Sequence, residues 1–306
     1  MNSQEDKERF LIRISELYYN EELGQQEIAD MFHISRPHIS RLLSTAKKQG
    51  IVNISIRNPY AYEQKLERVL KAQFNIKDIY VTGPGKVGEE GARYLERNLI
   101  DNDIISIMGG KTVWSVCVNA ACYSRKGLFF VPAIGGWGNT GSNWHANLNT
   151  QTLAENLHGD YYVLNAPSVV ATTEARDMFL AEKEISLVLD LARQSKYLLM
   201  SIGQISDKAT MVQTGVYSKD DFFELQQNGA VASLCSWFID KNGECVDFPA
   251  KERLIGLNAE EIRKIPNVIA VADGEDKAEA IAAALEGKWI DVLITDSAAA
   301  QRIIDL

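Results

Sequence analysis

Glycine pairs follow two of the apolar runs in this sequence, at points where strands of a sheet would end. After the runs 104–108 and 128–133 come the motifs Gly109-Gly110-Lys111-Thr112 and Gly135-Gly136-Trp137-Gly138. Glycine lets a ligand approach the backbone closely, and the N-terminus of a following helix favours an anion. Glycine pairs also simply turn a chain. Both a binding site and a structural turn therefore stay open at these motifs.

Polar residues gather after the second of these runs and after two later ones. The stretch 139–147 ends in Trp144, His145 and Asn147, and such a concentration of amide, hydroxyl and indole groups is typical of a carbohydrate surface. An ordinary surface loop has the same composition. The run 197–202 ends at Gly203 and Gln204.

The run 268–272 ends in an acidic segment at the start of another helix. Glu275 and Asp276 are satisfied there by the helix dipole without any ligand, and they would repel a phosphate. Lys277 must therefore supply the attraction if an anion binds at this helix start. Asp240, in a polar segment further back, is also explained as a residue that initiates a turn.

Strands and helices must alternate along the chain to place these loops at one edge of a sheet. Apolar runs predict strands over 79–82, 104–108, 128–133, 161–164, 197–202, 268–272 and 292–295. Amphipathic patterns predict helices over 88–99, 147–157, 184–193, 277–285 and 298–304. This alternation predicts an α/β fold with a mostly parallel sheet, whose ligands bind beyond the carboxyl ends of the strands.

The first part of the chain has a different pattern. Helices are predicted over about 7–20 and 25–32, and a third follows a short turn that contains His33. Ser35 is suited to be its N-cap and Pro37 falls in its first turn, while Ile39, Leu42, Leu43 and Ala46 form one apolar stripe. Two short helices joined by such a turn are the layout of a helix-turn-helix. His33 stands where glycine is common, and histidine tolerates a positive φ.

The outward side chains of the third helix are those that DNA-binding proteins use. The predicted DNA-binding residues are Gln26, Ser35, Arg36, His38, Ser40, Arg41 and Lys47, with Lys48 and Arg57 available for further phosphates. The alternating segment 50–57 is predicted to be a strand that forms the wing of a winged helix-turn-helix. The alternative is a small helical bundle with a solvated basic face.

Charge and length agree with a chain of two domains. The 306 residues are 46% hydrophobic and carry a net charge of −9, yet residues 1–60 sum to zero and 33–57 holds five Lys or Arg and no acid. An acidic body with one basic segment indicates a DNA-binding module attached to another domain. No apolar stretch approaches the ~20 residues of a membrane span, and the N-terminus is too polar for a signal peptide. The four cysteines are scattered and lack the spacing of a metal site. We expect a cytoplasmic protein without metal or cofactor.

A helix over about 62–74 lies between these parts. Leu66, Val69, Leu70 and Phe74 share one face of it, which suits an inter-domain linker or a dimer seam. We therefore predict three segments: a DNA-binding domain over 1–58, a linker helix over 59–75, and an effector and oligomerisation domain over 76–306.

Several segments together resemble the SorC family of bacterial transcriptional regulators over almost the full length. They are 34–43, 131–136, 229–231 followed by 239–243, 274–281 and 290–296. The resemblance implies a winged helix-turn-helix joined to a larger Rossmann-like α/β effector domain related to sugar-phosphate isomerases. It also implies that a sugar or sugar phosphate changes operator affinity, usually in a tetramer.

Carried onto this sequence, the resemblance gives ten effector contacts. They are Gly110, Lys111, Thr112, Gly135, Gly136, His145, Asn147, Gln204, Asp240 and Lys277. Asp240 and Lys277 sit inside the best-matched motifs. Ile134 stands where some relatives have Lys or Arg, which argues against an imine there and against a bisphosphate. Ser233 stands where the family motif has an Asp. The run 144–147 is most similar to the sorbose-regulator branch, which suggests a ketohexose or polyol effector.

The sequence therefore predicts a regulator of a carbohydrate-utilisation operon and not an enzyme. Its expected partners are double-stranded operator DNA, a sugar or sugar-phosphate effector and copies of itself in a dimer or tetramer, with no membrane. Two alternatives stay open: a sugar-phosphate isomerase or deaminase with an accessory DNA-binding head, and a constitutive DNA binder whose second domain only oligomerises.

Overall fold

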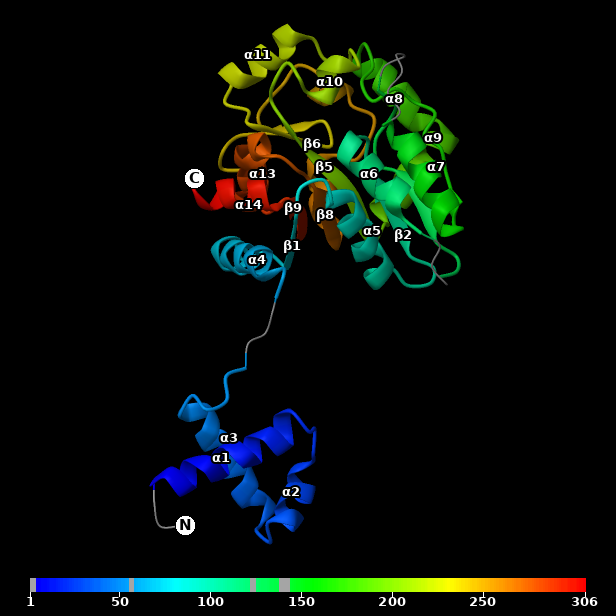
Figure 1. Ribbon diagram of the computed structural model, residues 1–306. Helices are drawn as coiled ribbons and strands as arrows, with labels where there is room; N and C mark the ends of the chain where they lie inside the picture. Colours follow the sequence, from blue (N-terminus) through cyan, green and yellow to red (C-terminus); the bar gives the residue numbers. More distant parts are fainter. Residues whose placement is uncertain (1–3, 55–57, 122–124, 138–143) are drawn as a thin grey trace. The chain divides into compact units, whose positions relative to one another are not determined.

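The computed structural model describes residues 4–54, 58–121, 125–137 and 144–306 (Figure 1). Arg57 and Cys122, and residues 139–143 of the polar stretch, lie outside the described residues. The chain forms two compact units, Met1–Pro59 and Tyr60–Leu306. Across the described ranges, no helix combines the length and the apolar composition that crossing a membrane demands.

The smaller unit is built from α1 (Gln4–Tyr19), α2 (Gln25–Met31) and α3 (Arg36–Lys48). Apolar residues at helical spacing give it a separate core, in which Ile14, Leu17, Ile28 and Ile39 are completely buried. The three predicted helices are thus confirmed, and α1 begins earlier than the sequence pattern indicated.

The turn between α2 and α3 has the predicted left-handed residue. His33 has φ 54°, and its neighbour Ile34 donates its N–H to the carbonyl of Ala29 at 3.0 Å. Ser35 is the N-cap of α3, but its hydroxyl makes no capping hydrogen bond. Its carbonyl accepts the N–H of His38 at 2.8 Å instead.

The first residues of the segment predicted as the wing form the C-terminal end of α3. Gly50 has φ 74°, and the N–H groups of Ile51 and Val52 both donate to the carbonyl of Ala46. Residues 50–54 consequently form a helix C-terminus and a bend, not a strand. The rest of the predicted strand, 55–57, lies outside the described residues.

The larger unit contains a seven-stranded parallel sheet in the order β1-β9-β8-β5-β2-β3-β4, within the described residues. The strands are β1 (Asp78–Thr82), β2 (Ile104–Ile107), β3 (Phe129–Pro132), β4 (Asp160–Tyr161), β5 (Tyr197–Gln204), β8 (Asn267–Val271) and β9 (Val292–Asp296). A hairpin of β6 (Ala232–Leu234) and β7 (Trp237–Ile239) pairs antiparallel with the end of β5. The parallel α/β fold predicted from the sequence is confirmed.

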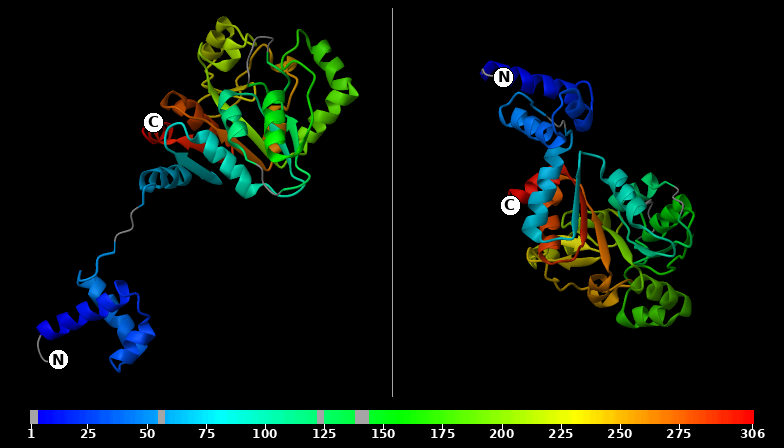
Figure 2. Two further views of the ribbon diagram at one scale, coloured as in Figure 1. Left: turned by 45° about the vertical axis from the view of Figure 1, so that its right-hand side comes forward. Right: turned by 90° about the horizontal axis from the view of Figure 1, so that it is seen from below.

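Helices cover both faces of this sheet (Figure 2). On one face, α5 (Val87–Asn98), α6 (Lys111–Asn119) and α7 (Ala146–Leu157) pack on Ile105, Leu199 and other buried strand residues. On the other lie α4 (Ala61–Phe74), α9 (Lys183–Arg193), α12 (Ala259–Lys264), α13 (Ala278–Glu286) and α14 (Ser297–Ile304). Shorter helices are α8 (Thr173–Ala181), α10 (Thr210–Gln213) and α11 (Lys219–Gln227), with 3₁₀ turns at Lys251–Arg253 and Glu275–Lys277. Side chains alternate between the two faces along each strand.

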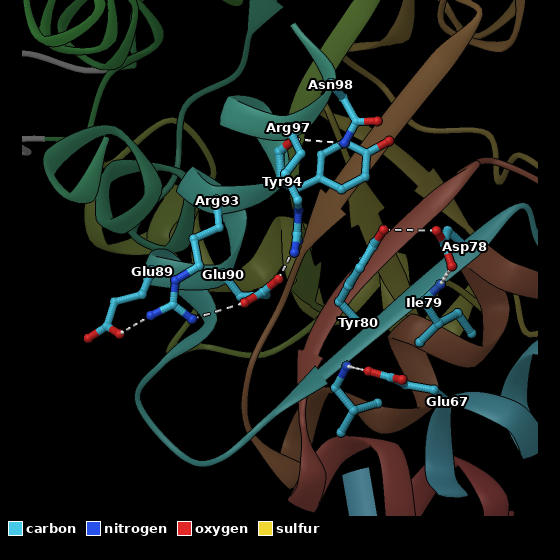
Figure 3. Close-up of polar contacts among 11 residues, drawn as sticks. Glu67, Asp78, Ile79, Tyr80, Glu89, Glu90, Arg93, Tyr94, Arg97 and Asn98 are labelled. Atoms are coloured by element: carbon cyan, nitrogen blue, oxygen red, sulfur yellow. Dashed lines mark hydrogen bonds and ion pairs between the residues drawn. The ribbon is translucent and has the colours of Figure 1, made fainter. Parts of the chain in front are cut away.

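Helix α4, which we predicted to be a linker, packs as part of the larger unit. Leu66 and Leu70 are buried in its main core. The Glu67 carboxylate accepts the N–H of Val81 on the edge strand β1 at 2.9 Å (Figure 3). Lys71 pairs with Asp78 at 3.1 Å. Burial raises the pKa of Glu67, partly offset by this hydrogen bond. The helix thus covers an edge that would otherwise present open backbone groups.

The strand order changes direction between β2 and β5. From β2 the chain proceeds through β3 to β4 at one edge, and from β5 it proceeds through β8 and β9 toward the other. The loops that leave β2 and β5 therefore diverge to opposite faces. Ligands of open α/β sheets bind at such a point, beyond the carboxyl ends of the strands.

Candidate functional site

A cavity lies at this point, beyond the ends of β2 and β5. Its volume is about 130 Å³. A cavity needs about 10–15 Å³ to hold a single water, so this one exceeds that minimum about tenfold. Its walls are the segments 108–112, 201–204 and 208–211, together with Trp137, Ser233, Cys235 and Lys277.

The loop after β2 forms one wall and requires its glycines. Gly110 has φ 133°, and its N–H donates to the carbonyl of Trp144 at 2.8 Å. A methyl group at position 110 would overlap the Ser201 hydroxyl, and one at Gly109 would come within 2.9 Å of Cζ3 of the Trp137 ring. This loop therefore has no space for larger residues, and it brings the backbone to the cavity surface.

Three lysines line the cavity, and among the described residues no Asp or Glu does. Lys111 begins α6, and its Nζ lies 5.8 Å from the centre of the Trp144 ring. Lys208 follows β5, and Lys277 follows β8. Lys277 Nζ lies 4.0 Å from Oδ1 of Asp273, which also accepts the Thr112 hydroxyl at 3.3 Å. The described lining is therefore cationic, and Asp273, which pairs with Lys277, is not part of it.

Burial lowers the pKa of Lys277. The nearby positive charge of Lys111 acts in the same direction, whereas Asp273, Asp276 and Asp296 oppose it. An ammonium group held in this way gains most from an anion that enters the cavity, because the anion replaces the water that burial removed. This arrangement favours a ligand with at least one negative group.

Five of the ten predicted effector residues line this cavity: Gly110, Lys111, Thr112, Gln204 and Lys277. They come from three separate segments of the chain, which the fold brings together at the switch point. The Gln204 amide donates to the Ser206 hydroxyl at 3.3 Å.

The glycine pair after β3 lies outside the lining and connects segments of the fold. Gly135 donates its N–H to the carbonyl of Ile255 at 3.0 Å, and Gly136 donates to Ala166 at 2.8 Å. A methyl group at position 135 would come within 2.5 Å of the Pro167 carbonyl oxygen. Close passage of neighbouring backbone therefore explains these glycines without a ligand.

His145 and Asn147 also lie outside the lining, and both make hydrogen bonds within the fold. His145 Nδ1 accepts the N–H of Trp137 at 3.3 Å, which fixes a residue of the cavity wall. The Asn147 amide donates to the Leu164 carbonyl at 3.1 Å and accepts the N–H of the same residue at 3.0 Å. His145 thus joins the start of α7 to Trp137, and Asn147 joins it to Leu164.

Asp240, one of the two residues in the best-matched motifs, is placed in a turn after β7 and not in the cavity lining. Its Oδ1 accepts the N–H groups of Asn242 and Glu244, each at 2.9 Å. These bonds correspond to the turn-initiating role that the sequence also allowed.

Several lining residues were missed by the sequence analysis. Ser201 continues a strand, Ser233 lies in the hairpin, and Lys208 and Thr210 follow β5. The available signal was the polar Ser201 at the end of an otherwise apolar run. The hairpin gave no signal, because its strands have three residues each.

The predicted DNA-binding residues are exposed on the smaller unit. Arg36, His38, Ser40 and Arg41 all lie on the exposed surface of α3, while Ile39, Leu43 and Ala46 on its other side are buried. Ser35 and Lys47 are exposed at the two ends of α3. Gln26 is exposed on α2, where its amide donates to Asp30 at 2.8 Å.

Known proteins are similar to this chain in sequence and in fold. Residues 58–305 match a family model described as "Putative sugar-binding domain". The deoxyribonucleoside regulator of Bacillus subtilis (strain 168) is 27% identical over 98% of both chains. The sorbitol operon regulator of Klebsiella pneumoniae is also 27% identical over 98% of both chains. The crystal structure of the full-length sorbitol operon regulator SorC from Klebsiella pneumoniae has a TM-score of 0.76, with 28% identity over 98% of this chain and 99% of that one. The chain therefore belongs to the sugar-binding domain family of the SorC-type transcriptional regulators.

Proposed function

We propose that this chain regulates a carbohydrate-utilisation operon by binding operator DNA through α3, and that a sugar phosphate in the cavity changes that binding. The observation that carries the proposal is the cationic cavity at the switch point, within a chain that also carries a helix-turn-helix unit. The relatives named above are regulators, so the enzyme alternative is not favoured.

The lining also argues against catalysis. Among the described residues, its ionisable side chains are the three lysines and Cys235. Burial raises the pKa of the Cys235 thiol, which therefore stays protonated. An isomerase or deaminase needs a positioned acid and base, and this set contains no such pair.

DNA binding is proposed for the exposed face of α3. Arg36 and Arg41 donate to phosphates or to guanine, and His38 and Ser40 extend the same surface near the start of the helix. A helix-turn-helix places the N-terminal part of this helix in the major groove. Operators for such units have two-fold symmetry, so we infer a homodimer or homotetramer. Such a protein works in the cytoplasm, where the operator is.

Effector control is proposed to be a population shift. The effector must bind one arrangement of the oligomer more tightly than another, and a tenfold change in operator affinity requires about 1.4 kcal/mol of coupling. A phosphorylated sugar suits this role, because its phosphate interacts with Lys111, Lys208 and Lys277 while its hydroxyls need the polar lining.

The test is a thermal-shift screen of the full chain against free monosaccharides, polyols and their monophosphates. A ligand that binds the folded state raises the melting temperature by mass action. We expect the shift from pentose or hexose monophosphates to exceed that from the free sugars. The effector proposal is overturned if no compound in the panel shifts the melting temperature at millimolar concentration.

A further inference from the structure

Two serine hydroxyls on the wall of the cavity have no hydrogen-bond partner in the part of the chain that the structure describes. Ser201 is on β5, and Ser233 is on β6, where it pairs directly with Gly203. Because residues two apart share a face, Ser201, Gly203 and Ser233 point to the same side, with only a glycine between the serines. Both serines line the cavity.

Neither hydroxyl is used by the fold as far as the described residues extend. Ser233 is 7% exposed, and no described residue hydrogen-bonds to its Oγ. The buried pair Ser106 and Ser195 differs, because their hydroxyls lie 2.7 Å apart and bond to each other. A hydroxyl without a protein partner can accept and donate one hydrogen bond to a ligand.

A glycine also lies next to each hydroxyl, where a larger residue would occupy the same space. A methyl group on Gly110 would overlap Oγ of Ser201, and one on Gly203 would overlap Oγ of Ser233. Gly110 needs glycine for its φ as well, but no positive φ accounts for Gly203. At Gly203, the room for the Ser233 hydroxyl is therefore the reason that a larger residue does not fit.

We propose that Ser201 and Ser233 determine effector specificity by hydrogen-bonding to two hydroxyls of one monosaccharide, while the cavity lysines hold its phosphate. This inference rests on the proposed effector function. Ser233 supplies a neutral hydroxyl where the motif of the family has a carboxylate, so it adds no negative charge to a cavity with three lysines. The favoured ligands are monosaccharide monophosphates that keep both of these hydroxyls.

The experiment measures dissociation constants of the full chain by calorimetry. Its probes are ribose 5-phosphate, glucose 6-phosphate and fructose 6-phosphate, with 2-deoxyribose 5-phosphate and 2-deoxyglucose 6-phosphate as analogues lacking one hydroxyl. Ser201→Ala and Ser233→Ala each remove one proposed contact and are compared with Ser186→Ala, a control on α9 outside the cavity. Melting temperatures of the free variants establish that all are folded.

For the tightest probe, we expect each cavity variant to lose roughly five- to tenfold in affinity, with no change in the control. Ser233→Asp loses more, because its carboxylate repels the phosphate. A deoxy analogue that lacks a contacted hydroxyl already lacks one of the two proposed hydrogen bonds. Its affinity therefore does not fall further in the alanine variant that removes the serine partner of that hydroxyl. Wild-type affinity of both alanine variants for every probe overturns this inference and leaves the proposed function intact. Absence of binding of any probe to the wild-type chain overturns the proposed function, and the inference with it.

Discussion

The cations of the two units differ in their surroundings, although both are proposed to bind phosphate. Arg36, Arg41 and Lys47 on α3 are exposed, whereas the Lys277 side chain is 22% exposed and has a lowered pKa. Exposed cations bind DNA mainly by releasing counterions from its phosphates. Each cation therefore contributes a small part of the DNA affinity, and that part decreases as salt concentration rises. A largely buried cation has already lost much of its water, so its contribution to anion binding is concentrated in one residue and depends on pH.

The largest expected effect is that of Lys277→Met. It removes the buried charge and keeps the side-chain volume, so affinity for a bound sugar phosphate falls roughly 30- to 100-fold. Calorimetry with the tightest monophosphate measures this loss. DNA affinity without effector stays at the wild-type value, because α3 is unchanged.

Lys241→Ala is the matched control for this prediction. Lys241 is an exposed lysine of the same unit and does not line the cavity. Equal losses in the two variants would mean that the net charge of the unit, and not the buried position of Lys277, controls anion binding.

A smaller effect is expected from Arg41→Ala on α3. Removing one exposed phosphate contact weakens operator binding by about tenfold and reduces the slope of log affinity against log salt by about 1. Fluorescence anisotropy across a series of salt concentrations measures both quantities. Arg9→Ala is the control, because Arg9 is exposed on α1 and pairs with Glu5 at 2.7 Å. An unchanged slope in Arg41→Ala would remove this residue from the phosphate contacts.

The smallest effect is a pH dependence confined to the cavity. Because the pKa of Lys277 lies below that of a free lysine, the ammonium is lost at a lower pH, and phosphate affinity declines as pH rises through this pKa. Folding has the opposite sign. At a pH between the pKa of Lys277 in the folded chain and its higher pKa in the unfolded chain, the unfolded chain binds more protons. The folded state therefore gains stability as pH rises through this interval. Calorimetry from pH 7.5 to 10 should show the affinity decline in the wild type and a flatter profile in Lys277→Met. Identical profiles would contradict the assignment.

The parallel sheet was predictable because buried strands in such sheets are continuous apolar runs. The predicted bounds of β2, β8 and β9 agree with the structure to within one residue. The β6–β7 hairpin was missed, since its turn uses Cys235 and Ser236 at φ 55° and 67° and contains no glycine to signal it. Strand β5 was predicted too short for the same reason, because its last residues pair only with β6.

The candidate site was predicted in part. Sequence alone could not distinguish the two glycine pairs, because Gly109 and Gly110 face the cavity whereas Gly135 and Gly136 contact backbone segments far along the chain. Lys277 was found from its position at a helix start. Ser233 could be noted only as a departure from the family motif, since its place at the cavity depends on the pairing of β6 with β5.

The central claim is that a ligand in the cavity controls DNA binding by a separate unit. The direct measurement is the operator affinity of the full chain, on a duplex selected from random DNA by binding, with and without the monophosphate that raises the melting temperature most. The account predicts a change of at least about tenfold in the wild type and none in Lys277→Met at the same concentration. Equal operator affinity of the wild type with and without saturating ligand would contradict it.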